Sequence, residues 1–145
     1  EPISQIELKE FIKEICKNVK VVNQKLITKI DSNIELSGRP LQLKRSITNI
    51  IENSLRYSKK IQVNVFDDEE NCFIEISDDG PGIPENNYED IFKPFFTLDP
   101  SRNKLKGESG LGMTIARDIV RSHGGDIKLS KSYLGGLKTI INLPI

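Results

Sequence analysis

Asn49 and Asn53 are the first side chains in this sequence whose types and spacing suit binding chemistry. They are four residues apart, so on a helix they share one face, together with Arg56. An amide oxygen is a neutral, hard ligand for Mg²⁺, which takes only one or two protein ligands in phosphate sites. Two amides on a solvated helix face are the alternative interpretation. The opposite face is apolar and predicts a buried side of the same helix, formed by Leu43, Ile47, Ile50, Ile51 and Ser54.

A second segment, DDGPGIP, runs from Asp78 to Pro84 after a predicted hairpin of alternating apolar residues. Gly80 and Gly82 allow positive φ and let a flat ligand approach the backbone closely. A purine base could lie against this loop, with the Asp78 carboxylate accepting a hydrogen bond from an exocyclic amine. Adenine carries that amine, whereas guanine has a carbonyl oxygen there, so the segment favours adenine. An ordinary Asp-Gly turn is the alternative.

The third segment, GESGLGM from Gly107 to Met113, precedes and opens a predicted helix. Its glycines expose backbone N–H groups at a helix N-terminus, where the partial positive charge favours phosphate. The lysine of a P-loop is absent, and the spacing does not fit a dinucleotide-binding fingerprint. The segment therefore predicts a phosphate-binding loop, with a flexible glycine-rich cap as the alternative.

These three segments, in this order and with IFKPFF (Ile91 to Phe96) between the second and third, resemble the ATP-binding catalytic domain of bacterial sensor histidine kinases, in the GHKL superfamily. The resemblance covers about Leu8 to Ile145. It implies ATP and Mg²⁺ as cofactors, Asn53 as the metal ligand with Asn49 in support, and Asn49, Asn53 and Arg56 as catalytic residues. It also implies a set of nucleotide-binding residues: Asn53, Tyr57, Asp78, Gly80, Gly82, Ile83, Arg102, Gly107, Ser109, Gly110, Leu111 and Gly112.

One position separates the branches of this superfamily. Gyrase-type and heat-shock-chaperone ATPases resemble one another in placing a glutamate base one helical turn before the metal-binding asparagine, where this chain has Asn49. An amide cannot take a proton from water at neutral pH. Glu52 adjoins Asn53, and because one residue rotates a helix by about 100°, we expect Glu52 to point away from the nucleotide. Both expectations predict slow hydrolysis of ATP.

A charged loop over residues 97–109 separates IFKPFF from Gly110. Long loops in compact domains are often functional, so we expect this one to order over bound nucleotide. Arg102, and with it Lys106, would then lie near the γ-phosphate or the partner domain. Thr97 stands where many family members carry arginine, and the contacts of that arginine cannot be carried over. Solvated charges without a role are the alternative.

Composition narrows the other classes of partner. The chain has 21 basic and 21 acidic side chains among 145 residues, so we expect no nucleic-acid partner and no direct membrane contact. Cys16 and Cys72 lack a metal-ligand spacing and are expected in the core of a cytoplasmic domain. We expect residues 1–145 to form a single domain, with residues 1–7 as the remnant of a linker from an upstream dimerisation domain.

The order of predicted elements defines an α+β fold class. Helices are expected over 8–19, after Pro40 and from Leu111 to His123, with a short helical stretch over 88–92. Strands are expected near 25–30 and 33–36, joined by a turn, then over 61–78 as a hairpin, and near 126–130 and 137–143. The resulting two-layer α/β sandwich, of the Bergerat type, has three main helices on one face of a mixed, mostly antiparallel sheet.

His123 is the only histidine in the chain. It falls in the last turn of a predicted helix, before Gly124, where imidazole commonly caps carbonyl groups. We therefore do not expect it to be the phosphorylated residue. The resemblance implies that the acceptor histidine lies in a separate dimerisation and histidine phosphotransfer domain of the parent kinase.

The function implied by the resemblance is that of a histidine kinase in a two-component system. The chain would bind Mg²⁺-ATP and donate the γ-phosphoryl group to that histidine, from which a response regulator receives it. The isolated domain would be a monomer on the cytoplasmic side, and the parent a homodimer anchored in the inner (cell) membrane. Two alternatives stay open: an ATPase that turns over ATP alone, and a nucleotide-binding interaction module without transfer activity.

Overall fold

The computed structural model describes residues 1–31, 33–96 and 110–145. Its sheet has five strands in the order β2-β4-β5-β7-β6, and only β2 and β4 run parallel. The elements along the chain are β1 (Ser4–Glu7), α1 (Leu8–Asn18), β2 (Lys25–Ile30), β3 (Glu35–Gly38), α2 (Pro40–Tyr57), β4 (Lys60–Asp67), β5 (Asn71–Asp78), η1 (Glu85–Asn87), η2 (Asp90–Phe92), α4 (Gly112–Ser122), β6 (Asp126–Lys131) and β7 (Leu137–Pro144).

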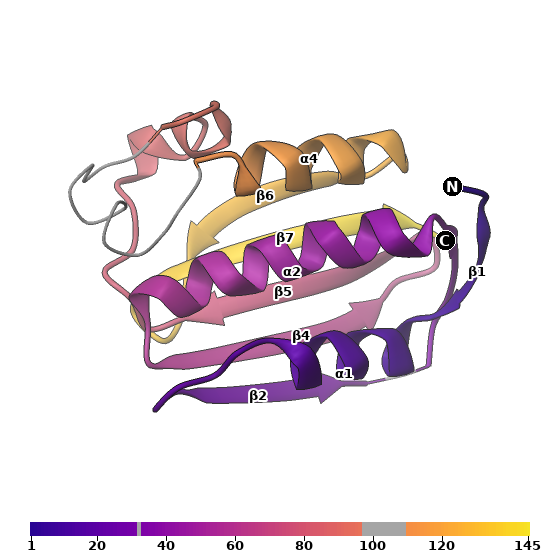
Figure 1. Ribbon diagram of the computed structural model, residues 1–145, viewed down its shortest axis with the longest axis horizontal. Coiled ribbons are helices and arrows are strands. Elements are labelled where there is room, and N and C mark those ends of the chain that lie inside the picture. The colour runs from indigo at the N-terminus through magenta and orange to yellow at the C-terminus, as the bar shows by residue number, and fades with distance from the viewer. Residues whose placement is uncertain (32, 97–109) are drawn as a thin grey trace.

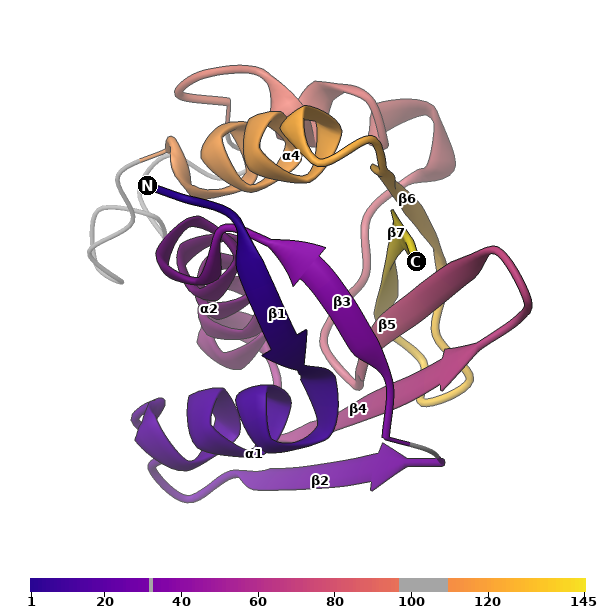
Figure 2. The same cartoon turned by 90° about the vertical axis from the view of Figure 1, so that its right-hand side faces the viewer.

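The helices α1, α2 and α4 cover one face of this sheet, side by side (Figures 1 and 2). This confirms the predicted two-layer α+β sandwich with its mixed, mostly antiparallel sheet. The expected helical stretch over 88–92 consists of two short 3₁₀ turns, η1 and η2. Within the described ranges, none of the helices combines the length and the apolar character needed to cross a bilayer.

The core lies between the helices and the sheet, as the hydrophobic periodicity predicts. Alternate residues of β4 and β5 are buried, including Val63 and Ile74, because successive side chains of a strand point to opposite faces. Five positions of the predicted apolar face of α2 are buried as well: Leu43, Ile47, Ile50, Ile51 and Ser54. Burial raises the pKa of the Cys16 and Cys72 thiols to about 11, so both remain protonated at neutral pH.

The pairing of β2 and β3 differs from the expected hairpin. β2 lies beside β4, whereas β3 pairs with β1 in a separate two-stranded sheet in which Ile6 opposes Leu36. Both of these side chains are buried, at 4% and 3% exposure. The short, alternating strands are recognisable from local spacing, but their partners are distant in sequence, and local spacing contains no signal for that choice.

The N-terminal residues are packed against the start of α2. The Glu1 carboxylate accepts hydrogen bonds from the backbone N–H groups of Leu41 (2.7 Å) and Gln42 (3.1 Å). Arg39, the N-cap residue, makes no side-chain capping bond of its own. Glu1 therefore satisfies backbone donors that the first turn of α2 leaves unpaired, and its negative charge is favourable at this end of the helix.

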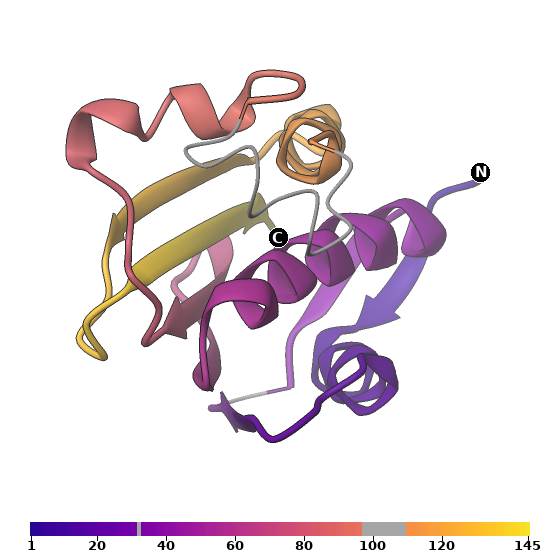
Figure 3. The ribbon, with the colours of Figure 1, turned by 60° about the vertical axis from the view of Figure 1, so that its left-hand side comes forward.

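α2 and α4 are joined at their crossing by a buried hydrogen bond. The Ser46 hydroxyl donates to the Ala116 carbonyl oxygen at 3.0 Å, and both residues are fully buried. The small side chains at this crossing allow the two helices to approach closely. In consequence, the C-terminal half of α2 and the first turn of α4 face each other at the end of the domain seen in Figure 3.

His123 connects the end of α4 to the start of α2. Its Nε2 accepts a hydrogen bond from the Arg39 backbone N–H at 3.0 Å, so the neutral ring carries its proton on Nδ1 and donates it to the Ile119 carbonyl, 2.8 Å away. The Ile119 contact is the capping role expected from the sequence. The Arg39 contact adds a tertiary link that the helix end alone does not predict.

We expect His123→Ala to lower the free energy of unfolding by about 1–2 kcal/mol, because the Arg39 N–H and the Ile119 carbonyl both lose their partner. Urea denaturation measures this loss. Nucleotide affinity serves as the control and should not change, since His123 is outside the pocket described below. A variant as stable as the parent would contradict the structural role of this ring.

Candidate functional site

An open pocket lies between the C-terminal half of α2, the segment after β5 and the start of α4, at the end of the domain seen in Figure 3. It contains about 520 Å³ of space, part of it open to solvent. We refer to it as the α2–α4 pocket. It is lined by Asn49, Glu52, Asn53, Arg56, Ile91, Phe96, Gly110, Gly112 and Met113.

The pocket brings together residues from two segments that the sequence singled out. Asn49, Asn53 and Arg56 come from α2, and Gly110 and Gly112 come from the start of α4. The Asn49 side-chain amide donates a hydrogen bond to the Gly112 carbonyl oxygen at 3.3 Å. Asn49 thereby holds the two segments together, while Asn53 lies one helical turn further along the same wall.

Glu52 also lines this pocket, and the expectation that it points away is wrong. Residues 49, 52, 53 and 56 have the spacing i, i+3, i+4 and i+7, which is a single stripe along a helix. A rotation of about 100° from Asn53 still falls within a stripe of this width. The sequence contained this signal, because Glu52 is three residues after Asn49 as well as one before Asn53.

Asp78 is at the end of β5 and is only 6% exposed. Its Oδ1 accepts hydrogen bonds from the backbone N–H groups of Gly80 and Leu137, each at 3.0 Å. Burial raises the pKa of this carboxyl, and the bonds from Leu137, Gly80 and the Ser54 hydroxyl oppose the shift. The structure thus holds a desolvated carboxylate in a single orientation, beside the loop that the sequence singled out.

The loop after β5 passes close to the C-terminal end of α2. A Cβ atom at Gly80 would lie 2.9 Å from the Tyr57 carbonyl oxygen, so close approach explains this glycine. Gly82 has φ +73°, the left-handed conformation expected for the loop, and Ile83 beside it is half-buried. Asp78 and this loop are not part of the α2–α4 pocket lining, but Tyr57 and Arg56 connect the two regions along α2.

Gly136 supports Asp78 from the turn between β6 and β7, and sequence reasoning assigned it no role in the site. Its N–H donates to the Asp78 carbonyl oxygen at 3.0 Å. A Cβ atom here would lie 2.1 Å from Asp78 Oδ1 and 2.6 Å from the Gly80 nitrogen, so no side chain fits. The Gly135-Gly136 pair marks a turn in the sequence, but its contact with Asp78 exists only in the folded chain.

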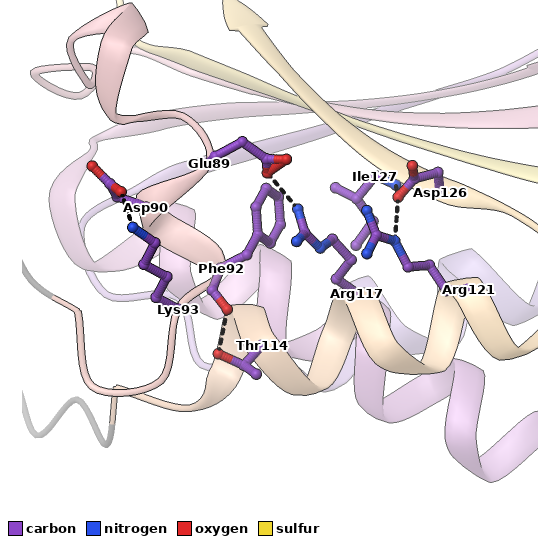
Figure 4. Close-up of polar contacts among 9 residues, drawn as sticks. All are labelled: Glu89, Asp90, Phe92, Lys93, Thr114, Arg117, Arg121, Asp126 and Ile127. Carbon is purple, nitrogen blue, oxygen red and sulfur yellow. Dashed lines mark hydrogen bonds and ion pairs between the residues drawn. The ribbon is translucent and has the colours of Figure 1, made fainter.

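α4 also holds the segment that contributes Ile91 and Phe96 to the pocket (Figure 4). The Thr114 hydroxyl donates to the Phe92 carbonyl oxygen at 2.8 Å. The Arg117 guanidinium lies 4.2 Å from the centre of the Phe92 ring and pairs with Glu89 at 2.6 Å. A single helix therefore supplies the glycine end of the pocket and positions its apolar wall.

Several predicted site residues lie outside the described ranges, namely Arg102, Gly107 and Ser109, together with the loop positions Thr97 and Lys106. Leu111 immediately precedes α4 and is half-buried, and Tyr57 is the last residue of α2. The part of the chain that the structure describes contains no cluster of three or more His, Cys, Asp or Glu able to hold a metal ion. The amide and carboxylate oxygens of the α2 stripe nonetheless are of the hard type that Mg²⁺ prefers.

Comparison with known proteins agrees with this geometry. Residues 38–145 match the family described as histidine kinase-, DNA gyrase B- and HSP90-like ATPases. The sensor histidine kinase GtrS of Pseudomonas aeruginosa is 41% identical over 108 residues, which cover 74% of this chain and 22% of that protein. The sensor histidine kinase CpxA of Escherichia coli is 40% identical over 111 residues, which cover 76% of this chain and 24% of that protein.

A solved structure, that of the mycobacterial sensor histidine kinase MprB, has the same fold, with a TM-score of 0.85 at 23% identity. The superposition covers 99% of this chain and 97% of that one. The chain belongs to the histidine kinase-, DNA gyrase B- and HSP90-like ATPase family. Within it, the chain is the ATP-binding domain of a sensor histidine kinase, and it spans about a quarter of the length of the curated relatives it matches.

We expect Gly136→Ala to lower nucleotide affinity at least about tenfold, because the added Cβ displaces the Asp78 carboxylate and its hydrogen bonds. Calorimetric titration with ADP measures the loss. Gly135→Ala is the matched control: its φ of +105° adds backbone strain, but no atom lies within 4 Å of the added Cβ. Equal affinities for the two variants would contradict the assigned role of Gly136.

Proposed function

We propose that this domain binds Mg²⁺-ATP between α2, the loop after β5 and α4, and donates the γ-phosphoryl group to a histidine of the parent kinase's dimerisation and histidine phosphotransfer domain. The observation that carries the proposal is the shared lining of one pocket by the amide face of α2 and the glycine-rich start of α4. These are the two kinds of group that a metal-bound triphosphate requires.

At the base end, Asp78 accepts a hydrogen bond from the adenine amine. Its Oδ1 is already held by Gly80 and Leu137, so the carboxylate is oriented before the nucleotide arrives. Gly80, Gly82 and Ile83 line the plane of the base, and Tyr57 lies near the ribose. Guanine is disfavoured because its carbonyl oxygen would face a buried carboxylate.

At the phosphate end, the backbone N–H groups around Gly110, Leu111 and Gly112 face the phosphates at the positive end of α4. Asn53 holds Mg²⁺ through its side-chain oxygen, and Asn49 supports it from the preceding turn. When bound, Mg²⁺ neutralises charge on the phosphate oxygens during transfer. Arg56 adds a cation to this wall, and Arg102, Gly107 and Ser109 complete the proposed set.

The reaction is an in-line phosphoryl transfer. A nitrogen of the acceptor imidazole forms a bond to the γ-phosphorus as the bond to the β–γ bridging oxygen breaks, which leaves ADP. The domain contributes position and charge stabilisation, which are the main catalytic terms for this chemistry. Asn49 cannot remove a proton from water, so attack by water is slow and the phosphoryl group is kept for the histidine.

The remaining proposals concern the parent protein. A response regulator receives the phosphoryl group from the histidine, as the sensor-kinase names of the relatives suggest. The domain is cytoplasmic and monomeric when isolated, whereas the parent is a homodimer anchored in the cell membrane.

Mixing the domain with a separately produced dimerisation domain and ATP labelled at the γ-phosphate should label the dimerisation domain and leave this chain unlabelled. The physical reason is that the nucleotide and the nucleophile come from different domains. Gel separation and an acid-lability test of the phosphate measure the result. Steady phosphate release by this domain alone, without transfer, would instead favour an ATPase.

We expect Asp78→Asn to weaken ADP binding by about 1.5–3 kcal/mol, because a charged acceptor is replaced and the new amide group presents a donor to the adenine amine. The fold should persist, since the Asn oxygen still accepts from Gly80 and Leu137. Asp79→Asn is the matched control, because that carboxylate accepts from Lys59 and Lys60 at the start of β4. Unchanged affinity for Asp78→Asn would contradict the adenine assignment.

The same variant tests the raised pKa of Asp78. Because the pKa in the folded state lies above the ordinary carboxyl value, the protonated form adds stability that is fully present below that ordinary value and is lost as pH rises through the folded-state pKa. Urea unfolding of the parent chain should show this fall with rising pH. In Asp78→Asn this contribution should be absent, and stability at pH 7 should be no lower than in the parent.

A further inference from the structure

We propose that Glu52 is an outer ligand of the nucleotide-bound Mg²⁺, whose carboxylate accepts hydrogen bonds from water molecules in the metal's coordination shell. This inference rests on the proposed function, because it concerns the metal that accompanies ATP. It assigns a specific role to a side chain that neither the motif residues nor the direct metal ligand includes.

The first argument is position. Glu52 lines the α2–α4 pocket next to Asn53, on the stripe that also contains Asn49 and Arg56. Its side chain is exposed, and it takes part in none of the ion pairs found within the described ranges. Among the residues that line the pocket, it is the only carboxylate. Its charge is therefore available to whatever occupies the space in front of α2.

The second argument is charge. A carboxylate beside a triphosphate repels it, so in a purely anionic site Glu52 would oppose binding. A divalent cation between the two reverses the sign of this interaction. Glu52 is thus compatible with the pocket only if the nucleotide arrives with its metal, and it makes the site selective for the metal-bound form.

The third argument is coordination chemistry. Mg²⁺ usually keeps several water ligands in phosphate sites, because it gives up its hydration shell reluctantly. Groups that hydrogen-bond to metal ligands change metal affinity by about 10–100-fold. A glutamate one residue from the direct ligand has the reach of a longer side chain and acceptors only, which suits bound water.

The competing role for Glu52 is a surface pair with Arg56, one helical turn later. Glutamate four residues before arginine is a favourable arrangement on an exposed helix face. Such a pair would influence nucleotide binding equally with and without Mg²⁺, since the metal takes no part in it. The two roles therefore differ in the metal dependence of binding.

The test is calorimetric titration with a non-hydrolysable ATP analogue over a series of Mg²⁺ concentrations and in EDTA. For Glu52→Gln we expect the Mg²⁺ concentration at half-maximal nucleotide affinity to rise about tenfold. In EDTA the variant should bind the analogue as tightly as the parent or more tightly, because repulsion is removed. Glu52→Asp, which keeps the charge on a shorter side chain, should fall between the two.

Glu10→Gln, an equal change of charge on α1 and outside the pocket lining, is the control and should behave as the parent. An unchanged Mg²⁺ midpoint for Glu52→Gln, or the same loss with and without Mg²⁺, would overturn this inference and leave the proposed function intact. Failure of the parent chain to bind the analogue at any Mg²⁺ concentration would overturn both.

Discussion

Asp78 joins two parts of the chain that are far apart in sequence, because its Oδ1 accepts hydrogen bonds from Gly80 in the loop after β5 and from Leu137 at the start of β7. Burying a carboxylate is costly, and a buried donor or acceptor left without a partner costs about 1–3 kcal/mol. The carboxylate therefore cannot turn away without losing these bonds. This constraint explains why the turn before β7 approaches so closely that only glycine fits at Gly136, and it sets the position of the loop that the base would contact.

The other end of the site depends on the contact between α2 and α4. The buried bond between Ser46 and Ala116 sets the spacing of the two helices, and Asn49 reaches across to Gly112 where they face the pocket. α4 also holds the segment around Phe92 through Thr114 and Arg117 (Figure 4). A change at the start of α4 is thus transmitted to the apolar wall of the pocket through one rigid helix. Binding of phosphate and placement of Ile91 and Phe96 are coupled for this reason.

The electrostatic character of the pocket is that of a site for a metal-bound anion. Its described lining contains one cation, Arg56, and one carboxylate, Glu52, with neutral amides between them. An amide replaces the acid that would activate water in the ATPase branch of the family, and in the proposed function this favours a nucleophile from another domain. The carboxylate that is present lies three residues later on the helix, beside the proposed metal ligand rather than at the base position.

The sequence by itself determined the elements and most of the site residues. Hydrophobic spacing predicted α2, α4 and the β4–β5 hairpin, because each depends on residues within one or two turns of a helix or along a strand. Glycines at 80, 82, 110 and 112 marked the segments where backbone would meet a ligand. Only the tertiary structure decided that β1 pairs with β3, that His123 contacts Arg39, that Gly136 supports Asp78 and that Glu52 faces the pocket. The first three join residues that are distant in sequence, and the side of α2 that becomes the pocket wall depends on where α4 and the segment after β5 pack against it.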